Sequence, residues 1–163
     1  MPDELAVRRR YLLTRGLAET GAYDKALALL DGDTGRHANL LRADIYWARE
    51  DWVAEATVLD GLFRDRATDQ PLDEEESGYL MKLAVSLALA NNRIALADLR
   101  DRFGSLIDAT PARDGFRALV SFVDGGPIDP ADLSATVAEI DTYEAYMASL
   151  RERVSEGALS AIN

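Results

Sequence analysis

The feature that most constrains this chain is a series of helix-forming segments, broken at short intervals by helix-ending residues. Alanine and leucine, which both favour helices, supply 26 and 23 of its 163 residues. No segment alternates apolar and polar residues over the length of a strand. Residues that tolerate the left-handed conformation at a helix end recur along the chain, at Gly21, Gly32, Asn91-Asn92, Gly104, Gly125 and Gly157. The sequence therefore predicts an all-α fold.

Capping residues mark where several of these helices begin. Asp73 precedes Glu76 by the three residues of a capping box. Thr110 and Asp129 each precede a proline, which is favoured at the first helical position. The links are short, so we expect consecutive helices to pack as antiparallel hairpins in one domain, 1–163. About eight helices are predicted, over residues 4–20, 23–31, 36–49, 52–66, 74–90, 93–107, 111–124 and 129–156.

Residues 13–27 contain a glycine, a spacer, an aromatic residue, two polar residues and an alanine, with Gly21, Tyr23 and Ala26 at the defining positions. This pattern resembles the central turn of a tetratricopeptide repeat. Weaker copies surround Trp52 and Arg93. The resemblance covers about residues 8–105. It implies a right-handed stack of helical hairpins, an α-solenoid, with a concave groove that receives peptides or helices of partner proteins.

The spacing of the three copies departs from the family. Tyr23 and Trp52 are 29 residues apart, and Trp52 and Arg93 are 41 apart, whereas the family repeats at about 34 residues. In the second copy the small residue is Ala56, one position later than strict register requires. The alternative architecture is an irregular helical bundle. Residues 111–157 are predicted to form a C-terminal helical pair that caps the stack.

Composition excludes several classes of function. The chain has no cysteine and one histidine, so thiol catalysis, disulfides, thiolate metal sites and histidine-rich metal clusters are excluded. Its 29 acidic and 18 basic residues give a net charge of −11, which disfavours nucleic acids and anionic membranes as partners. Gly125-Gly126-Pro127 lacks the lysine and hydroxyl of a phosphate loop. We expect no enzyme activity and no cofactor; the competing class is a hydrolase with paired carboxylates.

The N-terminal segment predicts a cytoplasmic protein if Met1 is the natural start. Acidic residues precede Arg8-Arg9-Arg10 and no apolar segment follows, which is the wrong order for a signal peptide. The longest uncharged stretch, Leu83 to Asn92, has ten residues, about half the length of a membrane span. We therefore expect no insertion into a membrane.

Positive charge is concentrated on the first helix. Arg8, Tyr11, Arg15 and Glu19 are spaced three, four and four residues apart and so share one helical face. Leu5, Leu12, Leu13 and Leu17 are expected to cover the adjoining core side. The resemblance implies that the charged face looks into the groove, together with His37, Leu40, Asp44, Trp47, Met81, Lys82 and Val85. The predicted partner is another protein, through an acidic or amphipathic peptide or helix. The alternative is that Asp44 pairs with Arg15 for structural reasons, and His37 alone is a solvated residue rather than a catalytic one.

The predicted last helix carries an apolar stripe at steps of three and four residues, apart from one gap near Glu144. A helix with such a stripe at the end of a repeat stack caps the open end of its core. The alternative is a seam between two copies in a homodimer. Both interpretations use the same residues, which are Leu133, Val137, Ile140, Met147, Leu150 and Val154.

Overall fold

A computed structural model describes residues 2–125, 131, 133–135 and 138. These residues are helical and contain no strand, which confirms the all-α prediction for this part of the chain. The predicted helix 129–156 falls almost entirely outside the described residues, as do Val137, Ile140, Met147, Leu150 and Val154. None of the helices that the structure describes is long and apolar enough to cross a membrane.

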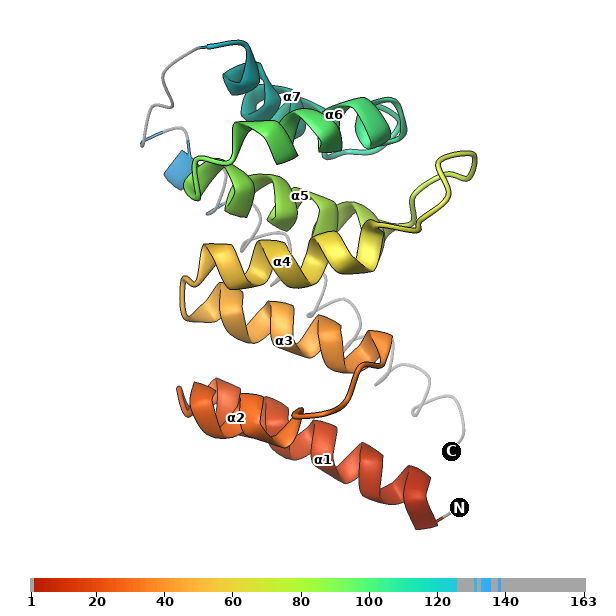
Figure 1. Ribbon diagram of the computed structural model, residues 1–163, viewed down its shortest axis with the longest axis vertical. Helices are drawn as coiled ribbons and strands as arrows, with labels where there is room; N and C mark the ends of the chain where they lie inside the picture. Colours follow the sequence, from red (N-terminus) through yellow and green to blue (C-terminus); the bar gives the residue numbers. More distant parts are fainter. Residues whose placement is uncertain (1, 126–130, 132, 136–137, 139–163) are drawn as a thin grey trace, which may run out of the picture.

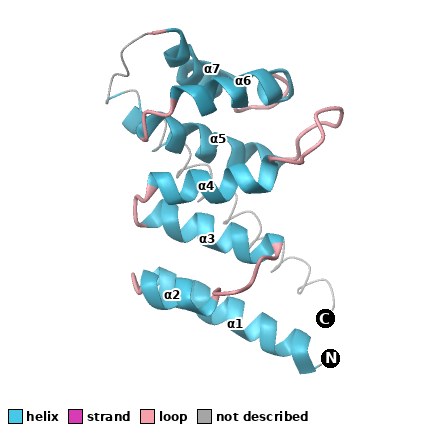
Figure 2. Ribbon diagram, in the orientation of Figure 1, coloured by secondary structure: helices cyan, strands magenta, loops and turns pink. Residues whose placement is uncertain are grey.

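Seven α-helices and one 3-10 helix follow one another along the described residues. Figure 1 shows them one above another, from α1 and α2 at one end to α6 and α7 at the other. Figure 2 shows that short loops join most of them, with one longer loop before α5. Their bounds are α1 Pro2–Glu19, α2 Tyr23–Leu29, α3 Arg36–Ala48, α4 Trp52–Phe63, α5 Glu74–Leu89, α6 Arg93–Ile107, α7 Arg113–Val120 and η1 Ser121–Asp124.

The turns that join α1 to α2, α3 to α4 and α5 to α6 have the same backbone geometry. Each contains one residue at positive φ: Gly21 at 77°, Glu50 at 58° and Asn91 at 55°. In each, the amide of the following residue donates to the carbonyl oxygen five residues earlier, at 2.8 to 2.9 Å. This is the Schellman arrangement, which ends a helix by satisfying its last carbonyl groups. The three helix pairs are therefore joined by turns of the same type.

Counted from these turns, the fourth residue of α2, α4 and α6 is equivalent and fully buried in each hairpin. Ala26, Glu55 and Leu96 occupy this position, each with no exposed surface. The sequence analysis assigned the small residue of the second copy to Ala56, whereas the turn geometry makes Glu55 the equivalent residue. The buried Glu55 carboxylate accepts a hydrogen bond from the Ser86 hydroxyl of α5, so α4 and α5 share a polar contact inside the core.

The capping predictions have different outcomes at α5 and α7. The Asp73 carboxylate accepts from the Glu76 amide at 2.8 Å, and the Glu76 carboxylate accepts from the Asp73 amide at 3.1 Å, which confirms the capping box. The cap predicted at Thr110 for the helix 111–124 is wrong, because α7 begins at Arg113 and Ala112 occupies its N-cap position. The Thr110 hydroxyl accepts from the Ala112 amide and donates to the Ile107 carbonyl, so it ties α6 to a turn before α7.

The main core surrounds α5, in which every residue from Leu80 to Ala88 is buried. A helix that is buried along all its faces needs no amphipathic pattern, and α5 packs against α4, α6 and α7. The described residue Leu133 belongs to this core. A smaller cluster joins α1, α2 and α3; its buried members are Ala26, Leu30, Ala38, Leu41 and Ile45.

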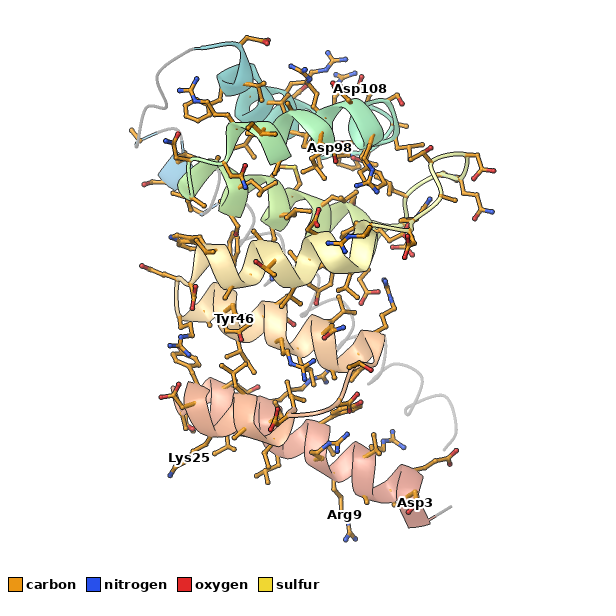
Figure 3. The ribbon with its side chains drawn as sticks, in the orientation of Figure 1. Asp3, Arg9, Lys25, Tyr46, Asp98 and Asp108 are labelled. Atoms are coloured by element: carbon orange, nitrogen blue, oxygen red, sulfur yellow. The ribbon has the colours of Figure 1, made fainter. Side chains whose placement is uncertain are left out.

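The prediction that four leucines of α1 are buried is wrong for three of them. Leu5, Leu12 and Leu13 are 62%, 61% and 56% exposed, and Leu17 alone packs against the smaller cluster. The buried side of α1 centres on Thr14 instead, whose hydroxyl donates to the Arg10 carbonyl oxygen. The reason is the position of α1 at one end of the described helices, which cover one side of it. In Figure 3, Arg9 points from α1 away from the other helices.

Candidate functional site

The residues predicted to line a groove come from α1, α3 and α5, and the structure connects them through two sets of contacts. Tyr11 and His37 join α1 to α3, while Asp44, Trp47 and Lys82 join α3 to α5. We call the surface that these residues define the α1/α3/α5 face. The predicted members are Arg8, Tyr11, Arg15, His37, Leu40, Asp44, Trp47, Met81 and Lys82.

The contact between α1 and α3 is aromatic, with a polar support behind it. The rings of Tyr11 and the exposed His37 lie 4.6 Å apart at 45°. The Tyr11 hydroxyl donates to the Asp33 carboxylate at 2.8 Å, and the Arg10 guanidinium pairs with the same carboxylate. The hydrogen bond to Asp33, with burial, raises the pKa of Tyr11 above 10.0, its ordinary value. The Tyr11 ring is therefore fixed in place, neutral, beside an exposed imidazole.

Asp33 and Arg42 hold the link between α2 and α3, and the sequence analysis missed both. The Gly35 amide and the Tyr11 hydroxyl donate to the Asp33 carboxylate, which keeps the pKa of Asp33 below its ordinary value. The Arg42 guanidinium donates to the carbonyl oxygens of Asp33, at 2.7 Å, and Leu30. The available signal was the Gly32-Asp33-Thr34-Gly35 turn, because aspartate often accepts from backbone amides of its own turn.

The contact between α3 and α5 centres on a buried lysine. Lys82 Nζ lies 3.2 Å from Asp44 Oδ1, and the same ammonium lies over the rings of Trp47, at 5.3 Å, and Tyr79, at 5.4 Å. The Tyr79 hydroxyl also donates to Asp44, at 3.2 Å. The Lys82 side chain is only 3% exposed, whereas that of Asp44 is 46% exposed. A buried ammonium is thus neutralised by a carboxylate that still reaches solvent.

This arrangement corrects the suggested pair between Arg15 and Asp44. Asp44 pairs with Lys82 across α3 and α5, and Arg15 remains exposed on α1. Tyr79, which the sequence analysis did not select, contributes to the same cluster. It stands one helical turn before Lys82, so the spacing of three residues on one helix face was the available signal.

Met81 and Val85 lie inside the protein rather than on its surface. Met81 is 6% exposed and Val85 has no exposed surface. A Cβ atom added to Gly115 of α7 would lie 3.3 Å from the Met81 terminal methyl group, so Met81 points toward α7. Of the remaining predicted residues on α3, Leu40 and Trp47 are half-buried. The exposed part of the α1/α3/α5 face is therefore its α1 and α3 half.

Arg8 and Arg15 differ from most arginines of this protein because they are exposed and, among the described residues, have no carboxylate or carbonyl partner. Arg9, also on α1, is the third such residue. Every other arginine of the described chain donates to or pairs with a neighbour; these are Arg10, Arg36, Arg42, Arg49, Arg64, Arg66, Arg93, Arg100, Arg102, Arg113 and Arg117. In a chain of net charge −11, unpaired positive charge on one helix is a local exception.

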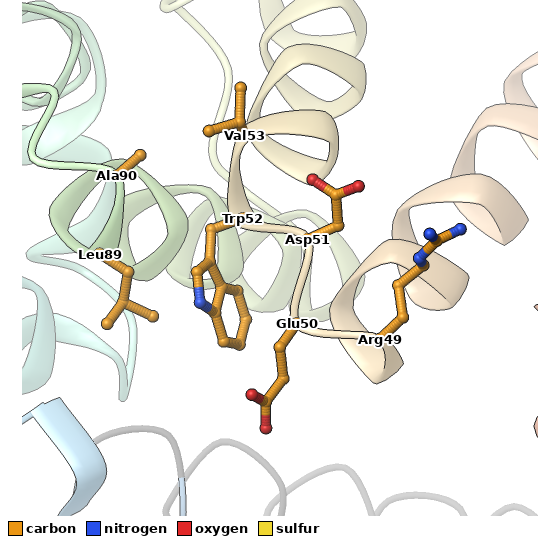
Figure 4. A pocket seen from close by; sticks show the side chains of 7 residues that line it. All are labelled: Arg49, Glu50, Asp51, Trp52, Val53, Leu89 and Ala90. Atoms are coloured by element: carbon orange, nitrogen blue, oxygen red, sulfur yellow. The ribbon is translucent and has the colours of Figure 1, made fainter.

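A concave surface lies at the turn between α3 and α4, next to the end of α5. It is an open depression of about 440 Å³, lined by Arg49, Glu50, Asp51, Trp52, Val53, Leu89 and Ala90. In Figure 4 the Trp52 ring lies between Leu89 and Glu50. We call this surface the Trp52 depression. Its Trp52 ring meets the ring of Trp47, a residue of the α1/α3/α5 face, edge to face at 5.4 Å.

Among the residues that the structure describes, no group of three histidine, aspartate or glutamate side chains could hold a metal ion. No protein-family model matches the chain. No curated protein matches it at a significant level, and no solved structure does so either. The resemblance to tetratricopeptide repeats therefore remains a prediction from the residues.

Proposed function

We propose that this protein is a non-catalytic protein-binding module, a right-handed tetratricopeptide-like stack that holds an acidic or amphipathic segment of another protein on the α1 and α3 half of the α1/α3/α5 face. The observation that carries the proposal is the pair of exposed, unpaired arginines, Arg8 and Arg15, on the same helix as the Tyr11 ring, which Asp33 holds against the exposed ring of His37. The three equivalent hairpin turns support the repeat architecture.

The chemistry of this surface favours a protein partner. Arginine and tyrosine are enriched where proteins bind one another, because each combines a large contact area with specific hydrogen bonds. Tyr11 is held by Asp33 before any partner arrives, so binding would cost little additional side-chain entropy. A guanidinium without an internal partner can donate two parallel hydrogen bonds to a carboxylate without breaking an existing contact.

Charge also favours an acidic segment over a basic or neutral one. Asp44 and Lys82 neutralise each other at the α5 side, so the positive charge of this surface comes from Arg8 and Arg15 of α1, with Glu19 on the same face of that helix. The remainder of the chain is strongly acidic and repels an acidic partner elsewhere. Binding should weaken with added salt, because screening shortens to about 8 Å at physiological ionic strength.

The test compares two double variants with the same change of charge. Arg8→Ala with Arg15→Ala removes the unpaired arginines, whereas Arg64→Ala with Arg113→Ala removes exposed arginines that pair only with acids in their own helices. Arg102 is unsuitable as a control, because it donates to the carbonyl oxygens of Phe63 and Arg64 at the end of α4. Partners captured from the source cell with the wild-type chain are then titrated against each purified variant.

We expect the Arg8 and Arg15 pair to weaken binding about tenfold or more, which corresponds to roughly 1.4 kcal/mol. The control pair should retain wild-type affinity, and both variants should keep the wild-type melting temperature. Equal affinity of the two variants, or a loss confined to the control, would place the binding surface elsewhere and overturn the proposal.

A further inference from the structure

The large apolar side chains that are exposed among the described residues gather in two places. Four lie on α1, and three lie where α4 begins, where α5 ends and where α6 begins. The first group is Leu5, Val7, Leu12 and Leu13; the second is Val53, Leu89 and Ile94. Exposed apolar groups that cluster in this way commonly mark contact surfaces.

The first surface, which we call the α1 outer face, consists of Leu5, Arg9, Leu12 and Leu13. Steps of four and three residues bring Leu5, Arg9 and Leu12 onto one side of the helix. This side is opposite the buried Thr14. Arg9 lies in the middle of the leucines and points away from the other helices (Figure 3). The α1 outer face is thus apolar with one unpaired positive charge at its centre.

The second surface, the Trp52 depression, has the opposite charge at its edge. Its apolar part is formed by Trp52, Val53, which is 66% exposed, and Leu89, which is 36% exposed. Glu50 and Asp51 lie beside them (Figure 4). The remaining charge of the lining, on Arg49, is paired with Asp24 at 3.2 Å, so the depression presents net negative charge.

We propose that a second copy of this chain places its α1 outer face in the Trp52 depression, so that copies associate head to tail. Two α1 outer faces meeting each other would bring Arg9 against Arg9, and two depressions would bring acids against acids. Only the unlike pairing covers the leucines of the α1 outer face together with the apolar part of the Trp52 depression, and it sets Arg9 opposite Glu50 and Asp51. Charge complementarity therefore selects a second copy in this orientation.

A contact between two different surfaces of the same chain does not close on itself unless the rotation between copies forms a ring. Each assembly of bound copies leaves one α1 outer face and one depression free, so association continues as the concentration rises. The contact involves few apolar residues on each side, so we expect it to bury a small area and to be weak. It does not use Arg8 or Arg15, so it stands apart from the function proposed above.

The test uses two variants that each remove one surface. Arg9→Gln with Leu12→Ser alters the α1 outer face, and Glu50→Gln with Val53→Ser alters the depression; all four residues are exposed. Light scattering measures the mean mass from about 10 µM to about 1 mM, the range in which weak interfaces form. Ala28→Ser with Ala118→Ser, at exposed positions outside both surfaces, is the matched control.

We expect the wild-type and control chains to increase steadily in mass beyond the dimer, and each surface variant alone to remain a monomer. An equimolar mixture of the two surface variants should form a dimer and stop there, because only one pair of intact surfaces remains. A wild-type chain that stays monomeric throughout, a wild-type mass that stops at the dimer, or a mixture that stays monomeric would each overturn the proposal.

Discussion

The pair formed by Arg66 and Glu76 holds the longest loop of the described chain, and its removal has a calculable effect. Arg66 donates to both Glu76 oxygens, at 2.8 and 2.9 Å, and to the carbonyl oxygens of Gln70 and Pro71. Glu76 is also part of the capping box with Asp73. Both side chains of the pair are 15% exposed, so solvent screens them little. Glu76→Gln should therefore loosen the loop and the start of α5 together.

The expected loss is about 2 kcal/mol of the free energy of unfolding at neutral pH. A hydrogen bond to a charged group contributes roughly 1.5 to 3 kcal/mol, and the glutamine oxygen can retain one of the two bonds. For a domain of this size, such a loss lowers the melting temperature by roughly 4 to 8 °C. Thermal unfolding followed by circular dichroism measures it. Glu75→Gln is the control, because the Glu75 side chain is 51% exposed and loses only one ion pair, with Arg36 at 4.0 Å.

The same pair predicts the direction of the pH dependence. The hydrogen bonds from Arg66 keep the pKa of Glu76 below its ordinary value of 4.5, against the opposing effect of burial. A carboxyl whose pKa is lowered on folding stabilises the folded state above its unfolded pKa, and that contribution disappears as the pH falls through the folded pKa. The difference between wild type and Glu76→Gln should therefore shrink in acid. A difference that persists at low pH, or that Glu75→Gln equals at neutral pH, would refute the reasoning.

Two further predictions concern the hairpin turns and the core. Glu50→Gly and Asn91→Gly should each raise the free energy of unfolding by about 0.5 to 1 kcal/mol, because glycine adopts positive φ without a steric cost. Gly21→Ala should lower the free energy of unfolding by about 1 kcal/mol for the same reason. Thermal melts of the three variants check the signs, and a reversed sign contradicts the turn geometry. Phe103→Ala should lower the free energy of unfolding by about 3 to 5 kcal/mol, because this ring is fully buried and meets Phe63 edge to face at 6.0 Å. Urea denaturation measures this loss, and a value below about 1 kcal/mol would show that the ring is not part of the core.

Local chemistry made several helix ends predictable, although the predicted stop at Gly104 is wrong, because α6 continues through it to Ile107. Gly21 and Asn91 end helices because each adopts positive φ, and Asp73 starts α5 through a box closed within four residues. Gly125 ends the 3-10 helix at φ 98° for the same reason. Such signals involve residues that are close in sequence, so no distant partner changes them. Glu50 was not a predicted stop, because glutamate rarely adopts positive φ and the Schellman hydrogen bonds enforce it here.

The candidate site was predictable only in part. The resemblance to the repeat family assigned residues of three helices to one surface, and among them the structure brings Tyr11 against His37 and Lys82 against Asp44 and Trp47. The ion-pair partner of Asp44 was not predictable, because the sequence offers two basic residues on neighbouring helices, Arg15 of α1 and Lys82 of α5, and does not distinguish them. The clamp of Asp33 and Arg42 depends on how a loop folds back on α3, which spacing along a helix does not describe.

The sequence by itself determined the secondary structure of this protein: all-α, with helix ends set by glycine, asparagine and capping side chains. The tertiary structure decided which faces of those helices are buried. Leu12 looks like a core residue and is exposed, whereas Lys82 looks like a surface residue and is buried. The physical reason is that burial depends on which helices lie alongside. Among the described helices, α1 stands at one end, and α5 lies between α4 on one side and α6 and α7 on the other.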